Sequence, residues 1–482
     1  MVFGVAGGSQ LETGYEVQNS ARFDNAGGSA LGTTFGTATN DKKFTLSFWF
    51  KVASGTTSGG RTLFGGRSGY ENIFIHEDTI RQDWNNASSG TVNWAPFVRD
   101  ESAWYHFVIA QDTTQGTAAN RAKFYINGEQ AGIRTGVTLS YPGQNLASGY
   151  NVSGVDFYLS SYNGSAGEVN GYYSEVAFVD GQQLTPSSFA ETSTDGIWVP
   201  KEFKDDVTFG NNGFYLEFKQ TGTGTNSSGI GADTSGNDNH LSVTGLAAQD
   251  ITTDTPTNNF CTMNPLTGGS RGTFAEGNLK VSLNMQGSVP YGQVEFGTFY
   301  VNKGKWYYEV KATTIGGGGQ VVFGWNERHE QGGYYNGHNN LGSSGNVWYG
   351  DDGKFQDGST SNTTSPATFS DGDIIGIACD FDNKKFYAHK NGTYQSNGTG
   401  TGDPANGTNG FSFTSHYNDF WTPWISKDSD NASHSPTAEF NFGNAPFSIS
   451  SGNADDNGHG NFEYDVPSGF YALNSKNLAQ FG

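Results

Sequence analysis

The stretch Asp371-Gly-Asp-Ile-Ile-Gly-Ile-Ala-Cys-Asp-Phe-Asp-Asn-Lys-Lys-Phe-Tyr-Ala-His-Lys-Asn-Gly392 decides the fold of this chain. It predicts two antiparallel strands joined by a tight Asp-Asn turn, because apolar residues recur at every second position: Ile375, Ile377, Cys379 and Phe381. A similar hairpin is predicted over 103–128, where Tyr105, Phe107 and Ile109 share a face. One such hairpin in each half predicts two antiparallel β-sandwiches in tandem, a fold class that usually binds surfaces rather than performing chemistry.

Length and composition agree with an all-β protein of two domains. The chain has 482 residues, enough for two domains of roughly 200 residues each. Its 70 glycines suit many turns, and its 36 phenylalanines suit half-buried strands. No helical period is sustained over a dozen residues, and the aromatic content of 14% argues against intrinsic disorder.

The charge excludes two classes of partner. The formal net charge of −21 disfavours nucleic acid, which needs clustered Lys and Arg, and it equally disfavours an anionic membrane surface. No segment approaches the ~20 apolar residues of a membrane span. The start of the chain has no basic leader before an apolar run, so we expect no signal peptide. The two cysteines, Cys261 and Cys379, predict no disulfide framework.

Three segments are expected along the chain. Residues 1–16 form an irregular N-terminal arm, residues 17–262 the first sandwich, and residues 263–482 the second. Predicted strands of the first sandwich include 44–50, 72–76, 155–159 and 172–179, and Pro186 opens a single helical turn. The stretch 254–260 is expected to be the passage between the domains.

Both halves resemble known families. The segments Lys43-Phe-Thr-Leu-Ser-Phe-Trp-Phe-Lys51 and Lys123-Phe-Tyr-Ile-Asn-Gly128 resemble the laminin-G-like, concanavalin A-like sandwiches. The segments Gly304-Lys-Trp-Tyr-Tyr-Glu-Val310 and Asp371-Gly-Asp-Ile-Ile-Gly376 resemble a SPRY domain, itself a concanavalin A-like sandwich of the jelly-roll type. Together with Asp195-Gly-Ile-Trp-Val-Pro-Lys201 and Gly469-Phe-Tyr-Ala-Leu-Asn474, the combination looks like long virion proteins of tailed, particularly marine, bacteriophages.

One segment departs from the family order. Asp233-Thr-Ser-Gly-Asn-Asp-Asn-His240 resembles a stretch that normally opens a laminin-G-like domain, yet here it follows the other strands. We therefore expect residues 211–245 to return to the first sandwich in a permuted order, since domain termini often lie close together.

Catalysis has weak support, and no catalytic residue is assigned. Glycoside hydrolysis usually needs two carboxylates across a cleft. The nearest candidates are Glu175 with Asp180 and Glu77 with Asp78, and neither pair has the alternation that aims both groups at one face. No nucleophile elbow or zinc motif is present. A polysaccharide depolymerase stays an alternative.

Calcium is a candidate ligand, because laminin-G-like and lectin relatives often hold it at the sandwich rim. The oxygen-rich loop with Asp233, Asn237 and Asp238 is the expected site, and 453–458 is a second Asx-rich loop. The alternative for both is a plain Asx turn.

Aromatic residues near polar loops are the candidates for ligand binding. Sugar-binding faces need an aromatic platform beside amide and carboxylate groups, and Trp and Tyr supply much contact area with few rotatable bonds. The alternative is packing of loops onto the sandwich or at a subunit interface. The residues assigned are Trp84, Trp94, Trp325, Tyr334, Tyr335, Trp348, Tyr349 and Trp421.

The expected function is that of a non-catalytic phage virion surface protein, such as a fibre, spike or decoration. Its partners would be a host-surface polysaccharide or glycoprotein and, through the N-terminal arm, other virion proteins. We expect a homo-oligomer, with a trimer as the specific guess, located at the virion surface after synthesis in the host cytoplasm. The alternative is a purely structural capsid or tail decoration with no host binding.

Overall fold

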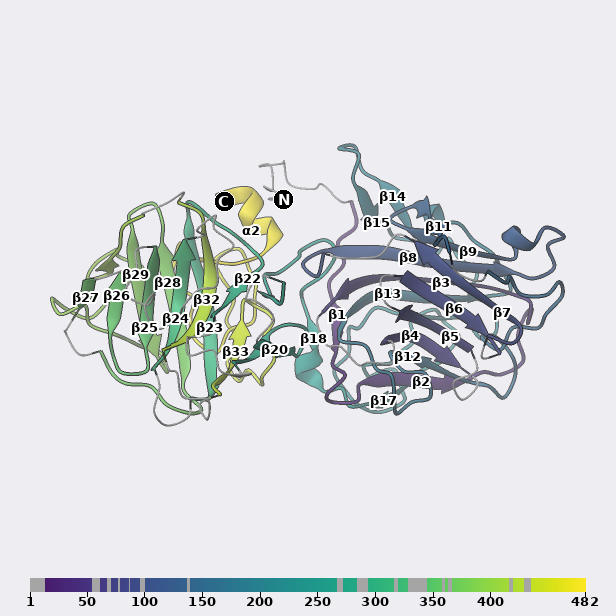
Figure 1. Ribbon diagram of the computed structural model, residues 1–482, viewed down its shortest axis with the longest axis horizontal. Coiled ribbons are helices and arrows are strands. Elements are labelled where there is room, and N and C mark those ends of the chain that lie inside the picture. Colours follow the sequence, from purple (N-terminus) through teal and green to yellow (C-terminus); the bar gives the residue numbers. More distant parts are fainter. Residues whose placement is uncertain are drawn as a thin grey trace. The chain divides into compact units, whose positions relative to one another are not determined.

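The computed structural model divides into two compact units, Leu11–Thr257 and Asn258–Gly482, and its regular structure is almost entirely β (Figure 1). The boundary lies before the expected one at 262/263. The structure describes residues 14–482 apart from 54–60, 67–70, 77–78, 86, 96–99, 137–138, 267–271, 284–293, 316–319, 328–344, 358–359, 363–365, 416–418 and 429–434.

Two antiparallel sheets form the first unit. Sheet A contains, in spatial order, β10 (Glu129–Gln130), β9 (Ala122–Ile126), β8 (Trp104–Asp112), β3 (Lys43–Val52), β13 (Gly171–Asp180), β1 (Ser20–Phe23) and β18 (Ile251–Thr252), with β16 (Phe214–Leu216) beside β13. Sheet B contains β11 (Gly132–Ile133), β7 (Gly90–Ala95), β6 (Thr79–Trp84), β5 (Glu71–His76), β4 (Arg61–Gly66), β12 (Asp156–Leu159), β2 (Ala30–Thr34) and β17 (Ser242–Thr244). Short 3-10 turns are η2 (Ala118–Asn120), η3 (Pro186–Ser188) and η4 (Ala248–Asp250).

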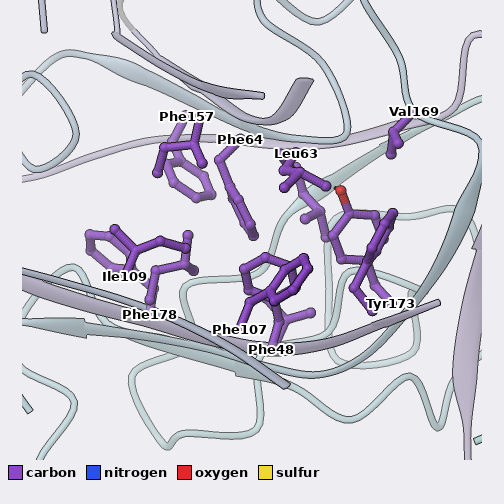
Figure 2. Close-up of a cluster of buried hydrophobic side chains, with 14 of the residues drawn as sticks. Phe48, Leu63, Phe64, Phe107, Ile109, Phe157, Val169, Tyr173 and Phe178 are labelled. Carbon is purple, nitrogen blue, oxygen red and sulfur yellow. Dashed lines mark hydrogen bonds between the residues drawn. The ribbon is translucent and has the colours of Figure 1, made fainter. Parts of the chain in front are cut away.

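Aromatic side chains fill the space between the two sheets, as Figure 2 shows. Phe48 of sheet A meets Phe64 of sheet B edge to face, with ring centroids 4.8 Å apart. Phe157 of sheet B and Phe178 of sheet A make a second contact between the sheets, with tilted rings whose centroids are 5.5 Å apart. An edge-to-face pair such as the first adds roughly 0.5–1.5 kcal/mol beyond the area it buries. The predicted face of the first hairpin is confirmed, because Phe107 and Ile109 lie in this core.

The outer face of sheet A is covered by a capping segment, residues 184–209. It contains η3 and a small hairpin of β14 (Ala190–Thr192) and β15 (Trp198–Pro200). Three of its phenylalanines bury the outward-facing Val108, Ala177 and Val179: Phe189, Phe203 and Phe209. The capping segment therefore adds a third layer on the sheet A side of the sandwich.

The stretch 211–245 packs into the first sandwich. Its β16 pairs with β13 through Phe214↔Phe178, and its β17 pairs with β2 through Val243↔Leu31 and forms the edge of sheet B. The expected passage at 254–260 is not a free linker. Asp254 is buried and accepts hydrogen bonds from Lys51 Nζ (2.9 Å) and Trp104 Nε1 (3.0 Å).

The second unit is also built from two sheets. Sheet C contains β19 (Met263–Asn264), β22 (Val294–Gly297), β32 (Trp421–Asp428), β24 (Gln320–Glu327), β25 (Asn346–Gly350), β26 (Phe355–Asp357) and β27 (Thr360–Asn362). Sheet D contains β20 (Gly272–Ala275), β21 (Lys280–Leu283), β33 (Thr437–Asn441), β23 (Lys305–Thr314), β28 (Ile374–Asp380), β29 (Lys385–Lys390) and β30 (Thr393–Tyr394), with β31 (Phe411–Ser412) beside β29 and β34 (Tyr471–Ala472) parallel to β23.

The hairpin predicted over 371–392 is confirmed as β28 and β29, paired from Ile375↔Lys390 to Asp380↔Lys385. Its four alternating apolar residues all lie in the core of the second unit. Here too a late segment covers a sheet, because Phe462 and Phe470 pack on Tyr307 and Tyr387 of sheet D. The helix α2 (Ser475–Phe481) was not predicted. It begins at Asn474, whose side chain accepts a hydrogen bond from the Asn477 N–H, as an N-cap requires.

Candidate binding face

The predicted aromatic platform of the first unit is buried. Trp84 and Trp94 lie on β6 and β7, with exposed fractions of 0% and 2%. The Trp84 Nε1 donates to Gln111 Oε1 at 2.7 Å inside the sandwich. The expected loop position is therefore wrong for both, because the polar stretch between them is only the turn of a hairpin whose strands run up to it.

The same correction applies in the second unit. Trp325 ends the inward row Val321, Phe323, Trp325 of β24, so the strand continues past Gly324. Within their strands Trp348, Tyr349 and Trp421 are buried too. Tyr334 and Tyr335 lie outside the described residues. A buried ring offers no face to a sugar, so the binding role of the six placed residues stays a prediction that their positions disfavour.

The predicted calcium residues serve the loop itself. The Asp233 carboxylate accepts from the N–H groups of Tyr215 (2.9 Å), Ser235 (2.8 Å) and Asn239 (2.9 Å). Asn237 Nδ2 donates to main-chain oxygens, and the Asp238 side chain is 90% exposed. These contacts are those of a plain Asx turn, which is the alternative to a calcium site. Across the described parts of the chain, no three His, Cys, Asp or Glu side chains are grouped to hold a metal.

Glu175 is a buried carboxyl group of the first unit with a raised pKa. It lies at the β-bulge of β13 with φ +53°, and its Oε2 accepts hydrogen bonds from the hydroxyl groups of Tyr15 (2.9 Å) and Tyr215. Burial raises the pKa of Glu175 to about 7, against the opposing effect of these two bonds. Part of the predicted arm, Tyr15, is thus docked on the domain.

The carboxylate pairs give hydrolysis no geometric support. Asp180 is 1% exposed and accepts from Thr39 N, Asn151 Nδ2 and Asn212 N, so it fastens loops together. Glu175 lies beneath two tyrosines rather than in a cleft. Glu77 and Asp78 fall outside the described residues.

The outer face of β5, β6 and β7 in sheet B carries polar and aromatic side chains in adjacent positions. Because Ile73, Ile75 and Ile80 point into the core, their strand neighbours must point outward. These outward neighbours are polar or aromatic, and most are half-buried. We call this set the open face: Asn72, Phe74, His76, Arg81, Asp83, Thr91 and Asn93.

Strand register brings the open-face residues together. Phe74 is opposite Arg81, and Arg81 is opposite Asn93. The Arg81 guanidinium carbon lies 5.6 Å from the centre of the Phe74 ring. Asp83 Oδ1 accepts from Arg81 Nε (2.9 Å) and from Thr91 Oγ1 (2.5 Å). The result is a patch with one aromatic ring, an oriented guanidinium and amide groups on adjacent strands.

Sequence reasoning missed the open face. The predicted binding residues were aromatic residues near polar loops, whereas the open-face residues alternate with isoleucine and valine within strands. The signal was present in 79–84, where every second position, Thr79, Arg81 and Asp83, is polar or charged, and in 71–76, where Asn72 and His76 alternate with the apolar Ile73 and Ile75.

Comparison with known proteins now agrees with this architecture. Residues 24–188 match the family model described as the concanavalin A-like lectin/glucanases superfamily, of laminin-G type, and residues 305–406 match the SPRY domain model. The chain carries a laminin-G-like domain followed by a SPRY domain. The expected fold, two concanavalin A-like sandwiches in tandem, is confirmed, and the open face belongs to the laminin-G-like domain. No curated protein matches the sequence.

Solved structures give likenesses too weak to support any argument about function. The SPRY domain of human HERC1 is 14% identical, with 37% of this chain and 96% of that chain covered and a TM-score of 0.28. A native heptameric SAP-like pentraxin from Limulus polyphemus is 13% identical, with 36% and 80% covered and a TM-score of 0.26. The TRIM65 PSpry domain is 12% identical, with 38% and 91% covered and a TM-score of 0.27. None of the helices in the described ranges has the length and hydropathy for a membrane crossing.

Proposed function

We propose that this chain is a non-catalytic surface protein of a phage virion and that the open face of its laminin-G-like domain binds host-surface glycans. The observation that carries the glycan-binding part is the juxtaposition of Phe74, Arg81 and Asn93 on adjacent strands, half-exposed on a sheet face. Saccharides are bound by stacking on a ring while fixed polar groups bind the hydroxyls. Both kinds of group are present here, and strands hold them more rigidly than loops would.

The virion part of the proposal rests on the sequence resemblance to long virion proteins of tailed phages. In this view the N-terminal arm contacts other virion proteins, and the assembled form is a homo-oligomer such as a trimer. The hydroxyl group of Tyr15 contacts Glu175 and Tyr215, which supports an arm that is anchored to the first unit at its last residues.

A binding screen tests the glycan-binding part. Purified protein would be applied to immobilised bacterial surface polysaccharides as wild type, as Phe74→Ala, and as the control Phe420→Ala, which removes a 45%-exposed ring from the SPRY domain. We expect saturable binding that Phe74→Ala weakens and Phe420→Ala leaves unchanged. Binding to virions with none to any polysaccharide would favour the purely structural alternative. Release of reducing ends would favour the depolymerase.

A further inference from the structure

Arg81 of the open face is held in one orientation by its neighbours. Its Nε donates to Asp83 Oδ1 at 2.9 Å, and the same oxygen accepts from Thr91 Oγ1 at 2.5 Å. The Phe74 ring lies beneath the guanidinium, 5.6 Å from centroid to carbon. A guanidinium fixed by a carboxylate at Nε and by a ring on one face has few rotamers left to lose when it binds a ligand.

The terminal nitrogens of Arg81 remain available in this arrangement. The Arg81 side chain is 28% exposed, and no acceptor in the described part of the protein is bonded to its Nη1 or Nη2. These two nitrogens present parallel N–H donors, whose geometry matches two oxygens of one carboxylate or sulfate group.

His76 adds a second donor on the same side of the sheet. It lies two residues from Phe74 on β5, and the two rings meet edge to face at 5.8 Å. Within the described residues the imidazole nitrogens have no hydrogen-bond partner, since the only bond at His76 is to its main-chain oxygen. One aromatic ring is therefore flanked by a guanidinium and an imidazole.

We propose that the open face selects saccharides carrying an anionic group, a carboxylate or a sulfate, which Arg81 binds through both terminal nitrogens. This inference rests on the proposed glycan binding and specifies its ligand class. Phe74 supports the guanidinium and makes the apolar contact to the sugar ring beside it, Asp83 and Thr91 position the guanidinium, and His76 donates to a neighbouring oxygen. The charge of −21 over the whole chain repels acidic polymers at long range, so their recognition has to be local.

Matched saccharides test the anionic group directly. Titration calorimetry would compare oligogalacturonate with its methyl ester, and a sulfated galactan oligosaccharide with its desulfated form. We expect the charged member of at least one pair to bind roughly tenfold tighter or more, the range for a hydrogen bond to a charged group. The pair that shows the difference distinguishes carboxylate from sulfate.

Variants connect that difference to Arg81. Arg81→Lys keeps the charge but loses the paired donors, so we expect it to remove most of the preference, whereas Lys123→Gln on sheet A removes one positive charge elsewhere and should not. Each variant's unfolding midpoint would check its fold. Equal binding of charged and neutral members that Phe74→Ala abolishes would overturn this inference and keep glycan binding. An unchanged preference in Arg81→Lys would also overturn it. Failure of all saccharides to bind would overturn both proposals.

Discussion

On both sheets of the first sandwich, side chains alternate between the core and the outer face. The two outer faces differ in whether another described segment of the chain covers them. On sheet A the outward residues include Val108, Ala177 and Val179, and the capping segment 184–209 buries them. On β5 to β7 of sheet B the outward residues include Arg81 and Asp83, and among the described residues no hydrophobic cluster covers them. The two faces thus differ in their covering: the cap makes a structural layer over Val108, Ala177 and Val179, and the described residues form no such apolar layer over β5 to β7.

The comparison also separates two kinds of polar group in the same domain. Glu175 of sheet A is beneath Tyr15 and Tyr215, where burial raises its pKa to about 7. Asp83 of sheet B is 5% exposed and accepts from Arg81 and Thr91. The Glu175 carboxylate, which has no cationic partner among its hydrogen bonds to described residues, is a cost to stability when ionised, whereas the Asp83 carboxylate is paired with the guanidinium that it positions.

The two faces should differ most in how much unfolding free energy is lost when one aromatic ring on each face is truncated. Phe203→Ala removes a 2%-exposed side chain that packs on Phe189 and Tyr215 and should lower the free energy of unfolding by about 3–5 kcal/mol. Phe74→Ala removes a half-buried ring and should cost about 1 kcal/mol or less. Urea unfolding of the first unit measures both. Equal losses would mean that the two faces are packed alike.

The protonation of Glu175 should have the next largest effect on the free energy of unfolding. Its pKa of about 7 in the folded state lies above the ordinary value of 4.5, so the folded state keeps a proton that the unfolded state has released between these pH values. Stability from this group is fully present below pH 4.5 and is lost as pH rises through 7, by on the order of 3 kcal/mol. Glu175→Gln should remove this loss.

The second unit offers a matched case for that pH experiment. Burial also raises the pKa of Glu295 to about 7, although the Gly272 N–H donates to it. Urea midpoints from pH 4 to 8 should show Glu175→Gln flattening the transition of the first unit and Glu295→Gln that of the second. A wild-type profile that already lacks the decline above pH 4.5 would contradict the assigned direction.

Removing charge from the open face gives the smallest effect on stability. The Arg81–Asp83 pair is partly exposed, and such pairs contribute roughly 0–1 kcal/mol. Arg81→Gln should therefore shift the thermal midpoint of the first unit by no more than a few degrees. A loss comparable to that of Phe203→Ala would assign Arg81 to the structural core instead of a binding surface.

Much of the fold could be predicted from local patterns. Period-two alternation was sufficient for β3, β8, β13 and β28, because a strand with one buried face shows its register in sequence. The caps could not be predicted, since Phe189, Phe203 and Phe470 are spaced irregularly in polar segments. The tryptophans were predicted in or beside loops because their sequence neighbours are rich in Gly and Asn. They lie in strands, as the alternation of apolar residues indicates. Predicting the open face would have required knowing which of the two sheets the capping segment covers. That depends on contacts between residues far apart in the sequence.

Hydrogen–deuterium exchange with and without the best-binding saccharide tests the central claim most directly. If the open face is the binding site, amide protection should increase over β5, β6 and β7, residues 71–76, 79–84 and 90–95, and stay constant over the cap at 184–209. Protection confined to the SPRY domain, or to the cap, with β5 to β7 unchanged would contradict the assignment of the binding site to this face.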